Sequence, residues 1–336
     1  MTFPALLELL LNGTDLTFEQ AGETMDALMA GGMEDAQVGG FLIAMRAKGA
    51  TAQELAGFAS AMTGHSVRLG QDYPNLVDTC GTGGGPSTFN LSTGAAILAA
   101  AAGAKVAKHG NRAVTSRCGS ADVLEALGVG LGAEPELLLK TLERVGIVFL
   151  FAPNHHPAMR FAGPARKALG VRTVFNQLGP LSNPAGAKRQ LVGVYDLSML
   201  VPMAEALNIL GAEKAFVVHS EEGMDEISPS GRTFVAELSD GRVTRRELCP
   251  ADFGMEPVPF ESLTAGRDID SSSSQLLEAL SDPKSPRSMA IVPNAAAALY
   301  LAGVAPTLIE CASLAREAVA NGAALRTLKE LVAWTS

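Results

Sequence analysis

This 336-residue sequence has few charged side chains and no surplus of positive charge. Charged residues make up 18% of the chain and hydrophobic residues 47%, a balance typical of a compact globular protein with a sizeable buried core. The formal net charge of −9 argues against a general nucleic-acid binder, which needs a basic surface. Any phosphate that the protein binds must therefore be held by local groups and not by the field of the whole molecule.

A targeting segment and a membrane-spanning run are also missing. The first residues, MTFPALLELLLNGTD, have no basic region, and Glu8 lies within their apolar stretch, so they are not a secretory signal. The most apolar region, 289–309, is interrupted by Pro293, Asn294 and Pro306. We interpret it as a strand followed by a buried helix and not as a membrane span. A cytoplasmic protein is expected.

Two further kinds of signature are absent. The four cysteines (Cys80, Cys118, Cys249 and Cys311) form no CxxC pair and no metal-ligand spacing, which favours reduced thiols. The glycine-rich run 81–85 does not complete GxGxxG, because Pro86 replaces the third glycine, and the chain has no GxxxxGK[ST]. These absences exclude the dinucleotide-binding and Walker readings of the glycines.

The pattern of apolar residues in the sequence changes near residue 70. Before that point the pattern is only helical: the apolar run Leu6–Leu11 is followed by two capping boxes, formed by Thr17 with Gln20 and by Thr51 with Glu54. Beyond it, short apolar strands alternate with helices, which predicts an α/β fold with a mostly parallel central sheet. The expected strands are 76–80, 105–108, 147–152, 189–195 and 214–220, and the expected helices include 92–102, 120–127 and 200–210.

The C-terminal third of the sequence gives weaker signals. Shorter, hydrophilic strands are expected over 221–248, with a hairpin around Asp240-Gly241. From residue 294 onward the pattern is helical again, with breaks at Gly303 and Gly322.

Polar segments follow four of the expected strands. They are the glycine-rich run 81–85 and the pairs 108–109, 155–156 and 225–226. In an open α/β sheet, ligands bind in the crevice beyond the carboxyl ends of the strands. We therefore expect these four segments to assemble one site.

The glycine-rich run has two readings. It could be no more than a tight turn. However, Asn90, Ser92 and Thr93 follow it at an expected helix start, where free N–H groups and the helix dipole attract anions. Together with the crevice argument, this favours phosphate binding.

The remaining segments carry charge. The run from Lys108 to Arg112, with Thr115 and Ser116 behind it, could be a solvated loop, but its charged donors suit a pyrophosphate. Asp225 and Glu226 could be a surface pair, but at a strand end they suit Mg²⁺, which binds one or two carboxylates plus substrate phosphates. The adjacent pair 155–156 is more consistent with a pocket wall than with metal ligands.

Three sequence motifs together resemble a known family. They are KVAKHGNRAVTSRCGSADVLEALG (105–128), FAPNHHPAMRFAGPARKALGVRTVFNQLGPLSNPAG (151–186) and GMDEIS (223–228). In this order and spacing they resemble the anthranilate phosphoribosyltransferases of tryptophan biosynthesis, and the resemblance covers nearly the whole chain. It implies transfer of the phosphoribosyl group of 5-phosphoribosyl 1-pyrophosphate (PRPP) to the amine of anthranilate, with Mg²⁺.

The resemblance also implies a domain organisation. A helical domain over 1–72 would be completed by a returning segment at about 164–184, and an α/β domain would comprise 73–163 and 185–336. The family further implies a homodimer formed through the helical domains, with the ligand site between the two domains. No nucleic-acid or membrane partner is expected.

Site residues follow from the resemblance by motif position. PRPP would be held by Gly81, Thr82, Gly84, Gly85, Thr88, Asn90, Leu91, Ser92, Thr93, Lys108, His109, Gly110, Asn111, Arg112, Ala113, Val114, Thr115, Ser116 and Ser120. Anthranilate would be bound by Gly81, His109, Asn111, His155, Met159 and Arg166, the arginine gripping its carboxylate. Mg²⁺ would be bound by Ser92, Asp225 and Glu226, and Lys108, Asp225 and Glu226 would be the catalytic residues.

One departure from the family pattern concerns the glycine-rich run. Gly85 stands where the family usually has an aspartate, and the segment to Thr88 is one residue shorter. Two alternatives stay open beside the transferase: a pyrimidine nucleoside phosphorylase, which shares the architecture, and a non-catalytic relative that binds nucleic acid. The KHGNR and HHPAMR segments argue against the first alternative, and the net charge of −9 argues against the second.

Overall fold

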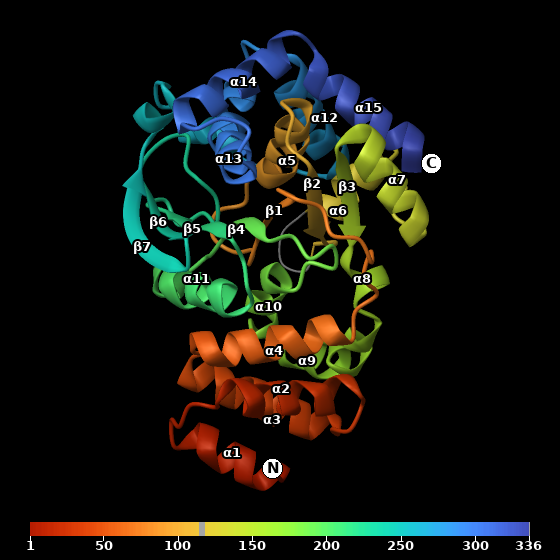
Figure 1. Ribbon diagram of the computed structural model, residues 1–336, viewed down its shortest axis with the longest axis vertical. Coiled ribbons are helices and arrows are strands. Elements are labelled where there is room, and N and C mark those ends of the chain that lie inside the picture. The colour runs from red at the N-terminus through yellow and green to blue at the C-terminus, as the bar shows by residue number, and fades with distance from the viewer. Residues whose placement is uncertain (114–117, 336) are drawn as a thin grey trace.

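The N-terminal part of the chain is a bundle of helices. The computed structural model describes residues 1–113 and 118–335. The first helices are α1 (Phe3–Leu11), α2 (Phe18–Met29), α3 (Asp35–Lys48) and α4 (Ala52–Gly64), which form the lower lobe in Figure 1. Both expected capping boxes are confirmed, because the side chains of Thr17 and Thr51 accept the backbone N–H groups of Gln20 and Glu54.

A seven-stranded sheet forms the centre of the upper lobe, within the described residues. Its strands are β1 (Val77–Gly81), β2 (Val106–Gly110), β3 (Ile147–Phe151), β4 (Arg189–Gly193), β5 (Lys214–Ser220), β6 (Thr233–Ser239) and β7 (Arg242–Leu248). They lie in the order β3-β2-β1-β4-β5-β6-β7, parallel from β3 to β5 and antiparallel from β5 to β7. The expected fold class, a small N-terminal helical domain with a larger α/β domain and a mostly parallel sheet, is confirmed.

The expected hairpin joins β6 to β7. Asp240 and Gly241 make its turn with φ values of 51° and 71°. Two consecutive residues in the left-handed conformation form a turn that matches the twist of paired strands. Asp and Gly tolerate this conformation, which is why an Asp-Gly pair predicts a hairpin.

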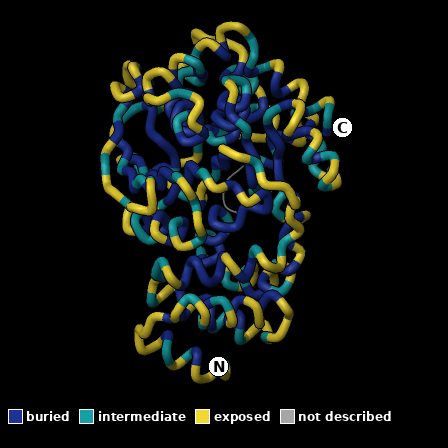
Figure 2. The backbone as a smooth tube through the Cα atoms, in the orientation of Figure 1, coloured by how far each residue is buried: buried dark blue, intermediate teal, exposed yellow. Residues whose placement is uncertain are grey.

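Helices cover both faces of the sheet. On one face, α5 (Leu91–Ala101) and α13 (Pro286–Ala302) pack against the strands. The same core includes α6 (Ser120–Ala126), α12 (Ile269–Ser281), α14 (Leu308–Ala320) and α15 (Ala323–Thr335). Helix α7 (Pro135–Val145) packs against β3, and its Leu138 and Leu142 share a separate core cluster with Val148 and Leu150. The other face packs against α11 (Leu200–Ile209). The core on this second face continues into the helical bundle, and Figure 2 shows buried backbone running from one lobe into the other.

A middle segment of the chain returns to the helical bundle. It comprises α8 (Ala152–His155), a short 3-10 helix (Pro157–Phe161), α9 (Gly163–Leu169) and α10 (Phe175–Leu181). Helix α9 packs against α3, and α10 packs against α4. Short 3-10 helices also occur at Leu197–Met199, Pro250–Phe253 and Phe260–Leu263. The chain therefore crosses between the lobes beside the carboxyl ends of β1 and β3.

The prediction of a strand at the start of 289–309 is wrong. Helix α13 runs through this region with Pro293 inside it, and nearly every residue of the helix is buried. Proline removes a single N–H donor, and the packing of a helix buried on all sides outweighs that loss. Among the described residues, no helix is long and apolar enough to cross a membrane.

A buried carboxylate holds the helical bundle together. Glu54 is fully buried and accepts the N–H groups of Leu16 (2.9 Å) and Thr51 (2.8 Å) as well as the Nζ of Lys48 (2.9 Å). We expect Glu54→Ala to lower the free energy of unfolding by about 3–5 kcal/mol, because it leaves two N–H groups without their acceptor and the Lys48 ammonium with only the exposed Asp15 as partner.

Chemical denaturation followed by circular dichroism measures this loss. Glu23→Ala, an exposed carboxylate on α2, is the matched control and should change stability by less than about 0.5 kcal/mol. Equal stability of the two variants would contradict the assignment.

Candidate active site

A cavity of about 390 Å³ lies beyond the carboxyl ends of β1, β2 and β5. Three of the four polar segments line it: the glycine loop (residues 81–88), the segment from Lys108 onward, and Asp225 with Glu226. This is the edge of the sheet where parallel strands of an α/β fold leave room for a ligand. The convergence expected from the order of the strands is thus present for three segments.

The glycine loop adopts a backbone that side chains disfavour. Gly83, Gly84 and Gly85 have φ values of +66°, +115° and +78°. A Cβ added at Gly85 would overlap the carbonyl oxygen of Gly223, whereas one at Gly83 would meet no atom closer than 3.9 Å. Gly85, which stands where the resemblance implies an aspartate, is therefore required by this loop as it is folded.

The acidic pair ties this loop to the end of β5. An Asp225 carboxylate oxygen accepts the Gly83 N–H at 2.8 Å. Glu226 accepts the Thr88 hydroxyl at 3.0 Å and the Ser92 N–H, at the start of α5, at 3.2 Å. The carboxylates therefore occupy the donors that would otherwise face an anionic ligand.

Burial makes this pair easy to protonate. It raises the pKa of Asp225, and burial together with the neighbouring Asp225 raises the pKa of Glu226 to about 8. The described residues contain no group of three His, Cys, Asp or Glu side chains that could hold a metal. A cation bound by this pair would need further oxygen ligands, such as those of a phosphorylated ligand.

Lys108 lies at the floor of the cavity. Its side chain is buried, and its Nζ donates to the Thr79 carbonyl at 2.5 Å and to the Ser92 hydroxyl at 3.3 Å. Burial lowers its pKa, and nearby carboxylates, Asp78 first among them, oppose that shift. Because an ammonium has three N–H donors, one remains for a ligand.

Asp78 fixes the strand that carries Lys108. It is fully buried and accepts the N–H of His109 at 3.1 Å and the side-chain amide of Asn183 at 2.7 Å. The carboxylate therefore joins β1, β2 and the segment after α10.

The segment after β2 differs from the expectation of free positive charge. Arg112 makes a bidentate ion pair with Glu125 (2.7 and 2.9 Å) and a further contact with Asp122 (3.1 Å). Its charge is thus compensated within the protein. Asn111 and Ser120 line the cavity, while Val114, Thr115 and Ser116 lie outside the described residues.

The fourth polar segment does not line the cavity directly. His155 makes a 2.8 Å hydrogen bond with the Val67 carbonyl, whereas the ring of His156 packs 5.2 Å from that of His109, which does line the cavity. Met159 and Arg166 are also outside the lining. Burial and the adjacent histidines lower the pKa of His109 to about 3, so this wall of the cavity is neutral at physiological pH.

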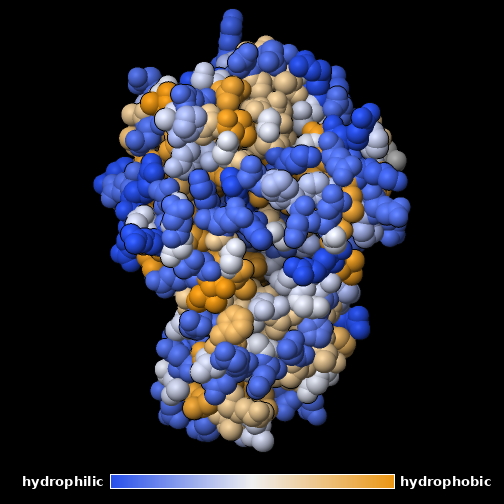
Figure 3. All heavy atoms as spheres, viewed as in Figure 1, coloured by the Kyte–Doolittle hydropathy of each residue, from blue (hydrophilic) through white to orange (hydrophobic). Residues whose placement is uncertain are grey.

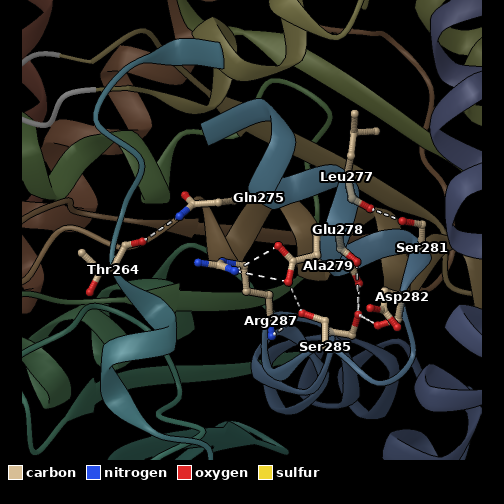
Figure 4. Close-up of polar contacts among 10 residues, drawn as sticks. Thr264, Gln275, Leu277, Glu278, Ala279, Ser281, Asp282, Ser285 and Arg287 are labelled. Carbon is tan, nitrogen blue, oxygen red and sulfur yellow. Dashed lines mark hydrogen bonds and ion pairs between the residues drawn. The ribbon is translucent and has the colours of Figure 1, made fainter. Parts of the chain in front are cut away.

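The segment Leu263–Thr264, which precedes α12 and is called the strap below, pairs with the end of the glycine loop. The Phe89 N–H donates to the Leu263 carbonyl (3.1 Å), and Thr88 and Thr264 form an antiparallel bridge. Figure 4 shows Gln275 of α12 donating to the Thr264 carbonyl, at 3.2 Å. The loop is therefore held along its length as well as at Gly83.

An ion pair between α12 and α13 supports the same strap. In Figure 4, Arg287 faces Glu278, with a closest contact of 2.9 Å, and Ser285 donates to the same carboxylate. The Arg287 guanidinium lies 6.0 Å from the ring centroid of Phe89. The two helices are thus joined directly behind the glycine loop.

Several lining residues were not predicted. Among the expected PRPP-binding residues, Leu91 and Thr93 are buried in α5 and do not line the cavity. The lining residues missed from the sequence are Cys80, Gly83, Pro86, Ser87, Cys118, Gly119, Arg172 and Asn176. Arg172 and Asn176 lie in the returning segment, where the sequence offers several arginines and no periodicity that says which one faces the cavity.

The fold and cavity define a transferase of the two-domain glycosyltransferase class. Residues 4–66 match the family described as "Glycosyl transferase family, helical bundle domain", and residues 73–325 match "Glycosyl transferase family, a/b domain". These two matches cover the helical bundle and the α/β part described above.

Individual relatives narrow the class. The anthranilate phosphoribosyltransferase of Desulfatibacillum aliphaticivorans is 46% identical over 334 residues, covering 99% of this chain and 98% of that one. The crystal structure of the Thermus thermophilus enzyme of that name has a TM-score of 0.92 at 44% identity, with 98% of each chain covered. This chain belongs to the anthranilate phosphoribosyltransferase family.

A more distant structure carries ligands. The anthranilate phosphoribosyltransferase of Saccharomyces cerevisiae, solved in complex with PRPP and Mg, has a TM-score of 0.89 at 28% identity, covering 99% of this chain and 97% of that one. Another structure of the yeast enzyme holds 4-fluoroanthranilate.

The backbone at Gly85 leads to a prediction. Gly83→Ala should lose about 1–2 kcal/mol of unfolding free energy, the cost of a left-handed backbone alone. Gly85→Ala and Gly85→Asp should lose more, because their Cβ also overlaps the Gly223 carbonyl. Both Gly85 variants should bind inorganic pyrophosphate with Mg²⁺ more weakly than Gly83→Ala, as measured by calorimetry. Tighter binding by Gly85→Asp than by the wild type would overturn this account of the loop.

Proposed function

We propose that this protein transfers the phosphoribosyl group of PRPP to the amine of anthranilate, giving N-(5-phosphoribosyl)anthranilate and pyrophosphate in tryptophan biosynthesis. The observation that carries the proposal is one cavity that combines a glycine loop, a helix N-terminus, a buried lysine and an acidic pair. Membership of the family supplies the reaction. The yeast relative solved with PRPP and Mg supports the choice of phosphorylated substrate.

The phosphates of PRPP would occupy the cavity. The glycine loop and Ser92, at the start of α5, line it, and anions bind well at such a helix start. When they bind, the phosphates would replace the carboxylate oxygens of Asp225 and Glu226 as acceptors for the Gly83, Thr88 and Ser92 donors.

Asp225, Glu226 and Ser92 would hold Mg²⁺ together with the substrate phosphates. Two carboxylates with a raised pKa beside the Ser92 hydroxyl, in a part of the described structure without a group of three His, Cys, Asp or Glu ligands, fit a metal that arrives with its substrate. The bound ion would supply charge neutralisation for the pyrophosphate.

Lys108 would stabilise the negative charge that develops on the leaving pyrophosphate in the transition state. The anthranilate amine attacks C1 of the ribose as the C1–O bond to pyrophosphate breaks, so negative charge grows on the leaving group. Lys108 and the N–H groups at the start of α5 stabilise that charge more in the transition state than in the ground state. The amine is already a neutral nucleophile, and positioning supplies much of the remaining acceleration.

Arg166 would bind the carboxylate of anthranilate. It is half-buried, and its guanidinium lies 5.1 Å from the ring centroid of Phe175. Burial lowers its pKa, and its guanidinium makes no hydrogen bond or ion pair with another described residue. A guanidinium left without a partner in such surroundings is suited to bidentate binding of a carboxylate. Asn111 and His109 would line the path between Arg166 and the ribose, with Met159 and His155 behind them.

A pyrimidine nucleoside phosphorylase is the second candidate, because it would also need a phosphate-binding glycine loop. The unpaired Arg166 favours the transferase, since a pyrimidine base carries no carboxylate. The decisive assay mixes the purified protein with anthranilate, PRPP and Mg²⁺ and follows the loss of anthranilate fluorescence. Phosphate-dependent cleavage of thymidine or uridine without that loss would favour the phosphorylase.

We further propose the organisation in which the site works. A helical domain (1–72 with about 164–184) pairs with that of a second copy, and the α/β domain is formed by 73–163 and 185–336. Leu11 on α1 and Ile43 on α3 are 63% and 42% exposed, and Figure 3 shows hydrophobic groups on the surface of this lobe. Sedimentation velocity measures the oligomeric state. A biosynthetic enzyme with four free cysteines is expected in the cytoplasm.

The metal assignment leads to a prediction. Asp225→Asn combined with Glu226→Gln keeps hydrogen-bond acceptors for Gly83, Thr88 and Ser92 but removes both charges. Magnesium-dependent turnover should fall by about a hundredfold or more, while circular dichroism stays unchanged. Glu221→Gln, an exposed acid in the same loop, is the control. Wild-type turnover in the double variant would remove the pair from the site.

The anthranilate assignment leads to another. Arg166→Ala should raise KM for anthranilate by tens to a few hundredfold, the effect of losing a charged hydrogen bond worth about 2–3 kcal/mol. KM for PRPP should change little, because PRPP has no group at that position. Arg160→Ala, which removes an exposed arginine stacked on Phe161, is the control. Equal losses for both substrates would show that Arg166 is structural.

A further inference from the structure

Arg172 connects the glycine loop to the helical part of the molecule. It lies between α9 and α10, and its guanidinium donates to the carbonyl of Gly83. The same guanidinium lies 4.2 Å from the ring centroid of Tyr195, which follows β4. It is stacked so closely on Gly84 that a Cβ there would overlap it.

The backbone of Arg172 is held from the other side. Arg46, on α3 of the helical bundle, donates to the Arg172 carbonyl at 2.7 Å. A continuous path therefore runs from α3, through the backbone and side chain of Arg172, to the glycine loop. The end of the glycine loop near Thr88 is held by the strap before α12. Arg172 connects the other end of the loop to the helical lobe.

The charge of Arg172 is not used in an ion pair. Of the residues that the structure describes, three with cationic side chains line the cavity: Lys108, Arg112 and Arg172. Arg112 is paired with two carboxylates, and Lys108 donates to two oxygens of β1 and α5. The Arg172 guanidinium has no ion pair with another described residue, and the hydrogen bond that it donates goes to the loop itself. The hydrogen bond from Arg172 therefore fixes the orientation of the Gly83 carbonyl.

We propose that Arg172 is a positioning residue that holds the glycine loop in its phosphate-binding shape and couples that shape to the helical domain through Arg46. The inference rests on the proposed function for the identity of the phosphorylated substrate. Three consecutive glycines with positive φ have many alternative conformations, and each conformation lost on binding reduces affinity. By fixing Gly83 from its carbonyl side while Asp225 fixes it from its N–H side, Arg172 removes that cost before the ligand arrives.

The first test compares three variants at the same segment. Arg172→Ala should raise KM for PRPP by about tenfold to a hundredfold, the range for losing a hydrogen bond from a charged donor, with kcat nearly unchanged. Arg172→Lys should fall between this variant and the wild type, since an ammonium can reach the carbonyl but cannot stack flat on Gly84 and Tyr195. Lys167→Ala, an exposed cation on α9, is the control and should match the wild type.

The second test asks whether the effect passes through the helical lobe. Arg46→Ala should raise KM for PRPP in the same direction by a smaller factor. It should add nothing in the Arg172→Ala background, because the two residues act along one path. Additive effects, or no effect of Arg46→Ala, would refute the coupling to the helical domain.

Direct binding separates this inference from the proposed reaction. Calorimetric titration with inorganic pyrophosphate and Mg²⁺ should show the same order, wild type tighter than Arg172→Lys and Arg172→Lys tighter than Arg172→Ala, even if the wild type does not consume anthranilate. Absence of wild-type turnover would overturn the proposed function alone. Unchanged pyrophosphate affinity in Arg172→Ala, or a lower kcat and melting temperature at constant KM, would overturn the positioning role.

Discussion

The hydrogen bond from the Gly83 N–H to the half-buried Asp225 carboxylate is the contact on which the site depends. It joins the loop after β1 to the loop after β5 across the intervening strand β4. Glu226 repeats the arrangement with Thr88 and Ser92. A buried carboxylate beside a half-buried one would be costly without such donors. The structure therefore keeps this acidic pair in place before any ligand binds, at the expense of a raised pKa for both groups.

The same pair explains how an acidic protein can bind a highly charged anion. The net charge of −9 gives no general attraction for phosphate, and Arg112 is neutralised by its own ion pairs. What remains is local: the N–H groups of a glycine loop and a helix start, one free donor of Lys108, and carboxylates able to take up a cation. A ligand that brings its own Mg²⁺ matches this combination, whereas a bare polyanion such as DNA does not.

Loop geometry is set from three directions. Asp225 fixes the Gly83 N–H, Arg172 fixes the Gly83 carbonyl, and the strap at Leu263–Thr264 pairs with the loop near Thr88. Gly85 then fits only as glycine, because the carbonyl of Gly223 occupies the space of a side chain. The missing aspartate and the tight loop are therefore one structural feature, in which the backbone of one loop packs directly on another.

Local chemistry allowed the sequence alone to determine the elements and their order. Capping boxes at Thr17 and Thr51, the Asp240-Gly241 turn and the apolar strands depend on neighbouring residues, and all are confirmed. The alternation of strands and helices also predicts that four polar segments meet at one edge, and three of them line the cavity. The tertiary structure decided the rest: that 289–292 is helical because packing surrounds Pro293, that His156 and not His155 contacts His109, and that Arg172 faces the loop. These outcomes depend on contacts between residues far apart in the chain, which no local pattern encodes.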